Sequence, residues 1–204
     1  MNEPETVFVV DDDTHVLASV DALLRGNGYA VRCFSCGADF LAAVNVPQIG
    51  CVLSDLQMPE MTGAELQEQL LARGSTLGLI VVTGYADVPS TVRIMEKGAV
   101  TLLEKPYDGQ SLMTVINKAL EHSRDVFHRR ASVQDAIAKI SLLDEEELQV
   151  MECAIRGMPV KAISDHLTMS NRTVDRRRQS ALTKAKVSSI SEFAILLATS
   201  RQQG

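Results

Sequence analysis

The sequence lacks any long hydrophobic run, and its longest apolar stretch is far shorter than the about 18 residues that a membrane-spanning helix needs. Its first residues, MNEPETVFVVDDD, are acidic and lead directly into a strand-like stretch, so we expect no signal peptide. Four cysteines in 204 residues are too few for a disulfide scaffold. Internal repeats and low-complexity tracts are also absent. These absences predict a soluble cytoplasmic protein with no membrane partner.

The charges are unevenly distributed along the chain. The composition, 46% hydrophobic and 23% charged, is that of a globular protein, and the length suits one large domain or two small ones. The formal net charge of −6 argues mildly against nucleic acid as a partner. However, residues 1–125 carry a net charge of −9 and residues 126–204 a net charge of +3, with +6 concentrated between Arg156 and Lys186. This division predicts two domains, one of which meets phosphates.

The first half of the chain alternates strand and helix signals. Short apolar runs that are bounded by Gly, Asp or Pro alternate with stretches in which apolar residues recur at helical spacing. The predicted strands are Val7–Val10, Ala30–Phe34, Cys51–Leu53, Leu79–Val82 and Thr101–Leu103. A β-α repeat of this kind predicts a parallel sheet with helices on both faces.

The second half reads as helical throughout. Neither Gly nor Pro occurs from Gln110 to Arg156, so the last helix of the first domain is predicted to continue as a long linker helix. Val126, Val133 and Ile140 lie at seven-residue spacing within it, which hints at pairing of this helix. The further predicted helices are Asp144–Arg156, Val160–Leu167, Asn171–Lys186 and Ser191–Thr199.

Chemically active side chains follow four of the predicted strands. They are Asp11 to Asp13, Asp55, Thr83 and Lys105. Any one of them alone would be read as an ordinary loop residue, but parallel strands end on one rim, where doubly wound sheets bind their ligands. Clustered carboxylates would repel one another unless a cation entered, and carboxylates suit Mg²⁺. One divalent ion and one ammonium group would balance the charge of three carboxylates, which prepares the site for an incoming phosphoryl group. An Asp carboxylate is itself able to accept that group.

Four segments, VFVVDDD, LSDLQMPEMTG, VVTGYADV and LLEKPY, resemble the receiver domain of bacterial two-component response regulators over roughly residues 5–122. The resemblance implies a flavodoxin-like α/β fold whose five-stranded parallel sheet has the order 2-1-3-4-5. It implies that Asp55 accepts phosphate from a sensor histidine kinase. It further implies that Asp12, Asp55 and the backbone carbonyl of Gln57 bind Mg²⁺, and that Asp11 assists through water.

The same resemblance implies roles on the fourth and fifth strands. Thr83 and Lys105 would contact the phosphoryl group, and Pro106 would follow Lys105 through a cis peptide bond. The family often has an aromatic residue three positions before the lysine that turns inward on activation. Leu102 stands there in this chain, so the aromatic part of that switch is missing.

The basic cluster reads as helix, short turn and longer helix over residues 160–186. Ser170 is a natural N-cap for the longer helix, NRTVDRRRQSALTKAK. A helix-turn-helix lays its second helix in the major groove of DNA. Three consecutive arginines, Arg176 to Arg178, span about 200° of a helix, which is wider than one contact face and favours an ordinary solvated position for one of them.

LLDEEELQVMECAIRGMPVKAISDHLTMSNRTVDRRRQSALTKAKV resembles the LuxR-type domain of the FixJ/NarL group of response regulators, over roughly residues 138–200. The family commonly has Asn where this chain has Val160, His where it has Arg177, and Leu or Met where it has Ala185. The last change would thin the core beneath the recognition helix. By alignment the base-facing positions are Asp175, Arg176 and Gln179. The full set of implied DNA-binding residues is Lys161, Arg172, Thr173, Asp175, Arg176, Arg178, Gln179 and Lys184.

The closing segment of the chain carries apolar residues at helical spacing, and core packing and dimerisation are equally good readings of it. These residues are Ile190, Phe193, Ala194, Leu196 and Leu197.

Together these observations predict a receiver domain in residues 1–122, a helical linker in 123–140 and a LuxR-type helix-turn-helix domain in 141–204. The protein is expected to be a transcription regulator rather than an enzyme, although slow hydrolysis of its own phosphate is compatible with the site. The resemblance implies a sensor histidine kinase, promoter DNA and RNA polymerase as partners.

Two routes to activation are open. Phosphorylation either exposes a dimer surface on the side of the fourth and fifth receiver helices or releases an inhibited recognition helix.

Two other functions are weighed. A Mg²⁺-dependent phosphohydrolase needs a general acid two residues after the nucleophile, where this chain has Gln57. A signalling adaptor whose helical domain binds protein rather than DNA is kept open by Val160, Arg177 and Ala185.

Overall fold

The computed structural model describes residues 5–84 and 99–202, which divide into two compact units at residues 128 and 129. The first unit contains a five-stranded parallel sheet of order β2-β1-β3-β4-β5, as predicted. Its strands are β1 (Thr6–Val10), β2 (Ala30–Phe34), β3 (Gly50–Asp55), β4 (Gly78–Thr83) and β5 (Thr101–Glu104). Each predicted strand is confirmed, with ends that agree within two residues.

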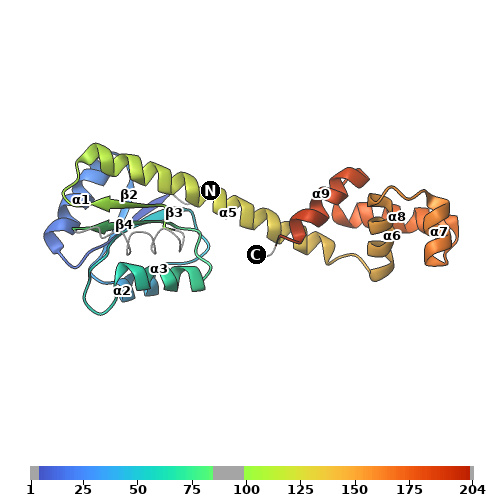
Figure 1. The fold of residues 1–204 in the computed structure, drawn as a ribbon. Coiled ribbons are helices and arrows are strands. Elements are labelled where there is room, and N and C mark those ends of the chain that lie inside the picture. Colours follow the sequence, from blue (N-terminus) through green and yellow to red (C-terminus); the bar gives the residue numbers. More distant parts are fainter. Residues whose placement is uncertain (1–4, 85–98, 203–204) are drawn as a thin grey trace. The chain divides into compact units, whose positions relative to one another are not determined.

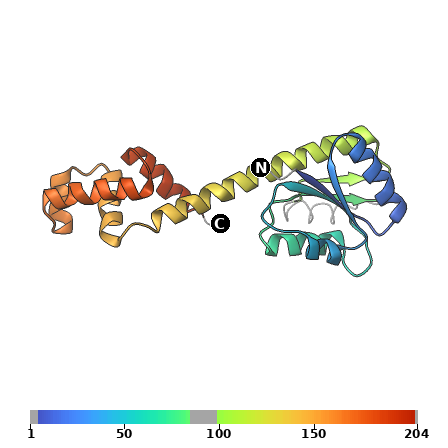
Figure 2. The ribbon, with the colours of Figure 1, turned by 180° about the vertical axis from the view of Figure 1, so that it is seen from behind.

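Two layers of helices cover the sheet (Figures 1 and 2). The described helices that begin in this unit are α1 (Thr14–Gly26), α2 (Gly37–Ala43), α3 (Gly63–Ala72) and α5 (Gly109–Ile140). α1 and α5 lie on one face and α2 and α3 on the other. The central strands β1, β3 and β4 are almost wholly buried because both of their faces are covered, as the near-continuous apolar run VFVV requires. The fourth receiver helix was expected to help form a dimer surface, and residues 85–98, between β4 and β5, lie outside the described residues.

Each face of the sheet has its own apolar core. The core under α1 and α5 is built around Val7, Val9, Leu24 and Ile116. The core under α2 and α3 contains an aromatic cluster, in which the Phe40 ring centroid lies 5.5 Å from those of both Phe8 and Phe34. Because these cores clamp the strands, the loops at the carboxyl ends of β1, β3, β4 and β5 are held on one rim.

Local signals in the sequence explain how the helices begin. Asp13 caps α1 by accepting a hydrogen bond from the backbone N–H of His15 at 2.8 Å. Thr62 and Glu65 form a capping box at the start of α3, in which each side chain accepts from the other residue's backbone N–H. These caps fix the points at which the chain leaves the rim.

α5 is a continuous helix of 32 residues, which confirms the long linker helix expected from the absence of Gly and Pro. Pairing of its seven-residue repeat with another helix stays a prediction. Within the first unit, buried Ser123 on this helix accepts a hydrogen bond from the backbone N–H of Gly50 at 3.1 Å. Arg124 forms an ion pair with Glu5, with Nε 2.6 Å from Oε1.

The second unit is helical throughout its described residues. Beyond the end of α5, it contains α6 (Glu145–Ile155), α7 (Val160–Leu167), α8 (Asn171–Ala185) and α9 (Ile190–Ser200), in close agreement with the predicted helices. Its core surrounds the fully buried side chains of Met151, Ile163 and Phe193. Ala185 lies in this core, next to the larger apolar side chains of the Phe193 cluster. In the described parts of both units, no helix combines the length and apolar character needed to cross a membrane.

Gly78 on β4 packs directly against the backbone of α5. A Cβ atom on Gly78 would lie 2.2 Å from the backbone carbonyl oxygen of Ala119 on α5, and backbone atoms yield poorly to such a contact. We therefore expect Gly78→Ala to lower the free energy of unfolding of the receiver unit by about 1–3 kcal/mol, as overpacking does. Urea unfolding followed by circular dichroism measures this loss. Gly26→Ala is the matched control, because a Cβ there meets nothing within 4 Å, and its midpoint should not fall.

Candidate functional site

Three carboxylates converge on the rim, as the order of the strands requires. Asp11, Asp12 and Asp55 each offer an oxygen atom that lies within 4.8 Å of the others. Asp11 is buried, Asp55 is half-buried and Asp12 is exposed. Asp11 is held in place because its Oδ1 accepts the backbone N–H of Asp13 at 2.9 Å. The acids at the ends of β1 and β3 therefore form one cluster.

Lys105 joins this cluster from the end of β5. Its Nζ lies 2.6 Å from Oδ2 of Asp55 and 3.2 Å from Oδ2 of Asp11. Partial burial by itself would lower the pKa of Lys105, but the hydrogen bonds and charges of Asp55 and Asp11 outweigh that effect and raise it. The ammonium group is therefore kept charged between two carboxylates. The peptide bond from Lys105 to Pro106 is cis, which confirms the expectation from the sequence.

The loop after β3 fixes the orientation of Asp55. The backbone N–H of Gln57 donates to Asp55 Oδ1 at 3.1 Å, while the N–H of Leu56 donates to the carbonyl of Val82 on β4 at 2.7 Å. A Cβ on Gly63 would lie 2.5 Å from the Asp55 carbonyl oxygen, so only glycine lets the start of α3 pack this closely. These contacts leave Oδ2 of Asp55 to Lys105.

Thr83 ends β4 on the same rim and is only 2% exposed. Its backbone carbonyl accepts the N–H of Lys105 at 2.8 Å, which ties the end of β4 to the turn that carries the lysine. Leu102, at the position where the family often has an aromatic residue, is half-buried on β5. The ends of β4 and β5 thus hold Thr83 and Lys105 next to each other on the rim.

This set of groups suits a small divalent cation together with an anion. Clustered carboxylate oxygens are the ligands that Mg²⁺ prefers, and three carboxylates, one ammonium and one divalent ion sum to a formal charge of about zero. A bound Mg²⁺ would supply positive charge to phosphoryl oxygens. Lys105 alone already offsets part of the repulsion among the acids.

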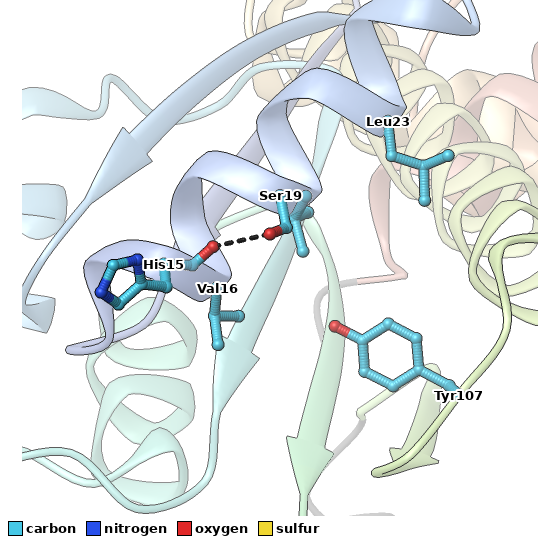
Figure 3. A pocket seen from close by; sticks show the side chains of 6 residues that line it. His15, Val16, Ser19, Leu23 and Tyr107 are labelled. Atoms are coloured by element: carbon cyan, nitrogen blue, oxygen red, sulfur yellow. Dashed lines mark hydrogen bonds between the residues drawn. The ribbon is translucent and has the colours of Figure 1, made fainter.

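A pocket of about 320 Å³ lies beside α1 (Figure 3). His15, Val16, Ser19 and Leu23 line it from α1, and the Tyr107 ring faces them from the loop after β5. Burial raises the pKa of the Tyr107 hydroxyl. Sequence reasoning missed this pocket, although Tyr107 stands in the LLEKPY segment, because spacing along the chain does not show that this loop faces α1.

The second unit contains the predicted helix-turn-helix in α7 and α8. Thr168 ends α7 in the left-handed conformation, with φ of 55°, and the chain then turns toward α8. Ser170 caps α8 by accepting the N–H of Thr173 at 3.1 Å, which confirms the predicted N-cap. Val174 is buried against α7 and α6. The turn and the cap therefore fix how α8 leaves α7.

α8 has distinct faces. Its buried face carries Val174, Ala181 and Ala185. Apart from Asn171 in the first turn, its exposed residues lie within an arc of about 100° on the opposite side, at 3.6 residues per turn. They are Arg172, Asp175, Arg176, Gln179, Thr183 and, just beyond the last turn, Lys186. Sequence reasoning missed Thr183 and Lys186, although helical spacing from Arg172 would have found them. Of the other predicted DNA contacts, Lys161 is exposed on α7, and Thr173, Arg178 and Lys184 are half-buried.

Lys184 is engaged inside the unit. Its Nζ donates to Oε2 of Glu147 on α6 at 2.8 Å, and the Ser180 hydroxyl donates to Oε1 at 2.7 Å. The Glu147 side chain is only 3% exposed. Its burial acts to raise its pKa, but the bonds from Lys184, Ser180 and the backbone of Asp144 outweigh burial and lower it. This charged group joins the first turn of α6 to the last turns of α8.

The closing helix α9 divides its apolar residues between the core and the surface. Phe193 and Leu197 are buried against Met151 and Ala181, so core packing accounts for them. Ile190, Ala194 and Leu196 are half-buried, whereas Ile195 is 68% exposed. An exposed apolar residue on α9 is therefore present at a position that the sequence reasoning did not select.

A parallel sheet with clustered carboxylates and a lysine on its rim, followed by a helix-turn-helix, defines a regulatory protein of the response-regulator class. Residues 7–117 match the model for the response regulator receiver domain, and residues 141–197 match that for bacterial regulatory proteins of the luxR family. The chain belongs to the two-component response regulators of the FixJ/NarL group, and it is a phosphorylation-controlled transcription regulator.

Individual relatives extend over nearly the whole chain. The transcriptional regulatory protein FixJ of Azorhizobium caulinodans is 36% identical over 95% of this chain and 92% of its own length. The tetrathionate response regulatory protein TtrR of Salmonella typhimurium is 33% identical, over 92% and 89%. The solved structure of the response regulator StyR is 35% identical, with a TM-score of 0.87 over 96% of this chain and 99% of that one.

Proposed function

We propose that Asp55 is the phosphoacceptor and that a sensor histidine kinase supplies its phosphate. The observation that carries this proposal is the convergence of Asp11, Asp12, Asp55 and Lys105 on one rim. Oδ1 of Asp55 is oriented by the backbone of Gln57, and Oδ2 faces a cation. A carboxylate in such a setting is able to attack a phosphoryl group.

We propose Mg²⁺ as the cofactor of this step. Asp12, Asp55 and the backbone carbonyl of Gln57 would hold the ion, with Asp11 assisting through water. Thr83 and Lys105 would contact the phosphoryl oxygens. Slow hydrolysis of the aspartyl-phosphate by the protein itself belongs to the same proposal.

We propose that α8 reads promoter DNA through its exposed face. Arg172, Asp175, Arg176 and Gln179 share that face, which supports base and phosphate contacts, and Lys161 of α7 is also exposed. Thr173, Arg178 and Lys184 flank it and remain proposed contacts, although Lys184 also holds Glu147. Asp175 would accept a hydrogen bond from a cytosine amino group and repel phosphates, which predicts an unusual sequence preference.

We propose that phosphorylation promotes a homodimer, which raises the local concentration of paired DNA-binding domains. The proposed division of the chain is a receiver in 1–122, a linker in 123–140 and a DNA-binding domain in 141–204. A protein with these partners would act in the cytoplasm and would meet RNA polymerase at promoters.

Selection from a genomic DNA library by the phosphorylated full-length protein tests the DNA-reading proposal. We expect enrichment of a site with two half-sites, because a symmetric dimer reads a repeated sequence. Binding to that site should weaken steeply as the salt concentration rises. Each DNA phosphate that the protein neutralises releases a counterion and adds about 0.9 to the magnitude of the slope of log K against log salt. The unphosphorylated protein is the control. Absence of any enriched sequence would favour the adaptor that binds protein through its helical domain.

A further inference from the structure

Arg177 differs from its two arginine neighbours in what it contacts. Its Nη1 donates to Oδ2 of Asp144 at 2.6 Å, and its Nη2 donates to Oε2 of Glu146. Both acids belong to the N-terminal turn of α6, more than thirty residues away along the chain. Neither Arg176 nor Arg178 forms an ion pair with another residue in the described parts of the chain.

The guanidinium of Arg177 is drawn into the contact between α6 and α8. The side chain is 24% exposed, and Nε is buried without a hydrogen-bond partner among the described residues. At about 100° per residue, Arg177 and Lys184 point to the same side of α8. That side is turned about 100° around the helix axis from Arg176, which lies on the exposed face. Lys184 meets Glu147 on this side. Two separate charged contacts, two turns apart, therefore join this side of α8 to the first turn of α6.

Two such contacts resist rotation of α8 about its own axis. The fully buried residues of α8, Val174, Ala181 and Ala185, are small or β-branched, and its one longer apolar side chain, Leu182, is only half-buried against the core. Short side chains define the rotation of a helix less sharply than long ones, so the charged contacts add to what apolar packing fixes. The rotation decides which residues face outward, and Asp175, Arg176 and Gln179 face outward here. In addition, two carboxylates already neutralise the single charge of Arg177, so it has little attraction left for a phosphate.

We propose that Arg177 is a positioning residue for DNA reading, which fixes the rotation of α8 on α6 through Asp144 and Glu146 and does not itself bind a DNA phosphate. The inference rests on the proposed reading of DNA by α8. It assigns the three consecutive arginines to different tasks, with Arg177 turned toward the protein.

Three variants with the same substitution at adjacent positions test this role: Arg176→Gln, Arg177→Gln and Arg178→Gln. Full-length proteins are titrated against a short fluorescein-labelled duplex of fixed sequence over a range of KCl concentrations, well below the melting temperature of every variant. Circular dichroism confirms that each one is folded. The readouts are the dissociation constant and the slope of log K against log salt.

We expect Arg177→Gln to weaken binding by about fivefold at every salt concentration and to keep the wild-type slope. Arg176→Gln, on the exposed face, should reduce the magnitude of the slope by about 0.9, as loss of one phosphate contact does. Arg177→Lys retains a charge for the two acids and should recover most of the lost affinity.

A slope reduced by about 0.9 in Arg177→Gln would identify Arg177 as a phosphate ligand and overturn the proposal. Unchanged affinity in Arg177→Gln would show that its ion pairs do not affect DNA reading, which also overturns it. If the wild-type protein itself shows no salt-dependent binding, the proposed DNA reading fails and the inference falls with it. Failure of the proposed DNA reading is distinguished from failure of the inference about Arg177, because in the first case the wild-type protein and all variants fail to bind the duplex alike.

Discussion

Replacement of Asp55 by asparagine should abolish covalent phosphorylation. Incubation of the wild-type protein with a small phosphodonor and Mg²⁺ should add one phosphate, seen as a mass increase of the intact chain. An amide oxygen is a far weaker nucleophile than a carboxylate, and Asp55→Asn also removes a negative charge from the cation site, so no label is expected. The fold should persist, because neutralising one of three clustered acids relieves repulsion while the Lys105 contact to Asp11 remains.

The matched control for Asp55→Asn is Asp13→Asn. Asp13 lies two residues from Asp11 and caps α1, and asparagine caps helices about as well as aspartate. This variant should therefore be labelled as efficiently as the wild-type protein. Labelling should also disappear when Mg²⁺ is removed by a chelator. A mass increase that persists in Asp55→Asn would show that another residue accepts the phosphate and would contradict the assignment.

The receiver was predictable because strong local signals agree with one another. Apolar runs such as VFVV mark strands that are buried on both faces, and the acids that follow them reach one rim because parallel strands end on the same edge. Asp11, Asp55 and Lys105 were found in this way and do come together. Backbone contacts could not be predicted, such as the close approach of Gly63 to the Asp55 carbonyl, because they depend on how a loop folds back.

In the helical unit, the positions of helices were predictable and the partners of charged residues were not. The sequence favoured a solvated position for one of the three arginines, and the resemblance left Arg177 out of the DNA-binding set. That Arg177 instead pairs with Asp144 and Glu146 could not be predicted, because these acids are distant in sequence. Lys184 was assigned to DNA for its charge alone, whereas its ammonium also holds the buried Glu147. Helical periodicity fixes the face on which a residue lies, but only the packing of helices decides which face meets which.

The buried carboxylate of Glu147 should be the most costly single charge to remove from the helical unit. Glu147→Gln leaves the donors of Lys184, Ser180 and the Asp144 backbone facing an amide that cannot accept all three. Removing one partner of a buried ion pair costs about 3–5 kcal/mol, and partial exposure of Lys184 suggests a loss of about 3 kcal/mol at pH 7. Urea unfolding of the full chain by circular dichroism, with hydrogen exchange of α6 and α8 to locate the loss, measures this effect.

The pH dependence of this effect has a definite sign. Because the folded state lowers the pKa of Glu147 below its ordinary value of 4.5, the stabilisation is fully present above that value and is lost as the pH falls through the folded pKa. The difference in stability between wild-type protein and Glu147→Gln should therefore be greatest near neutral pH and shrink on acidification. Glu145→Gln is the matched control, since Glu145 is exposed in the same first turn, and its effect should be small at every pH. Equal losses in the two variants would mean that the charge of the first turn, and not the buried contact to α8, stabilises the unit.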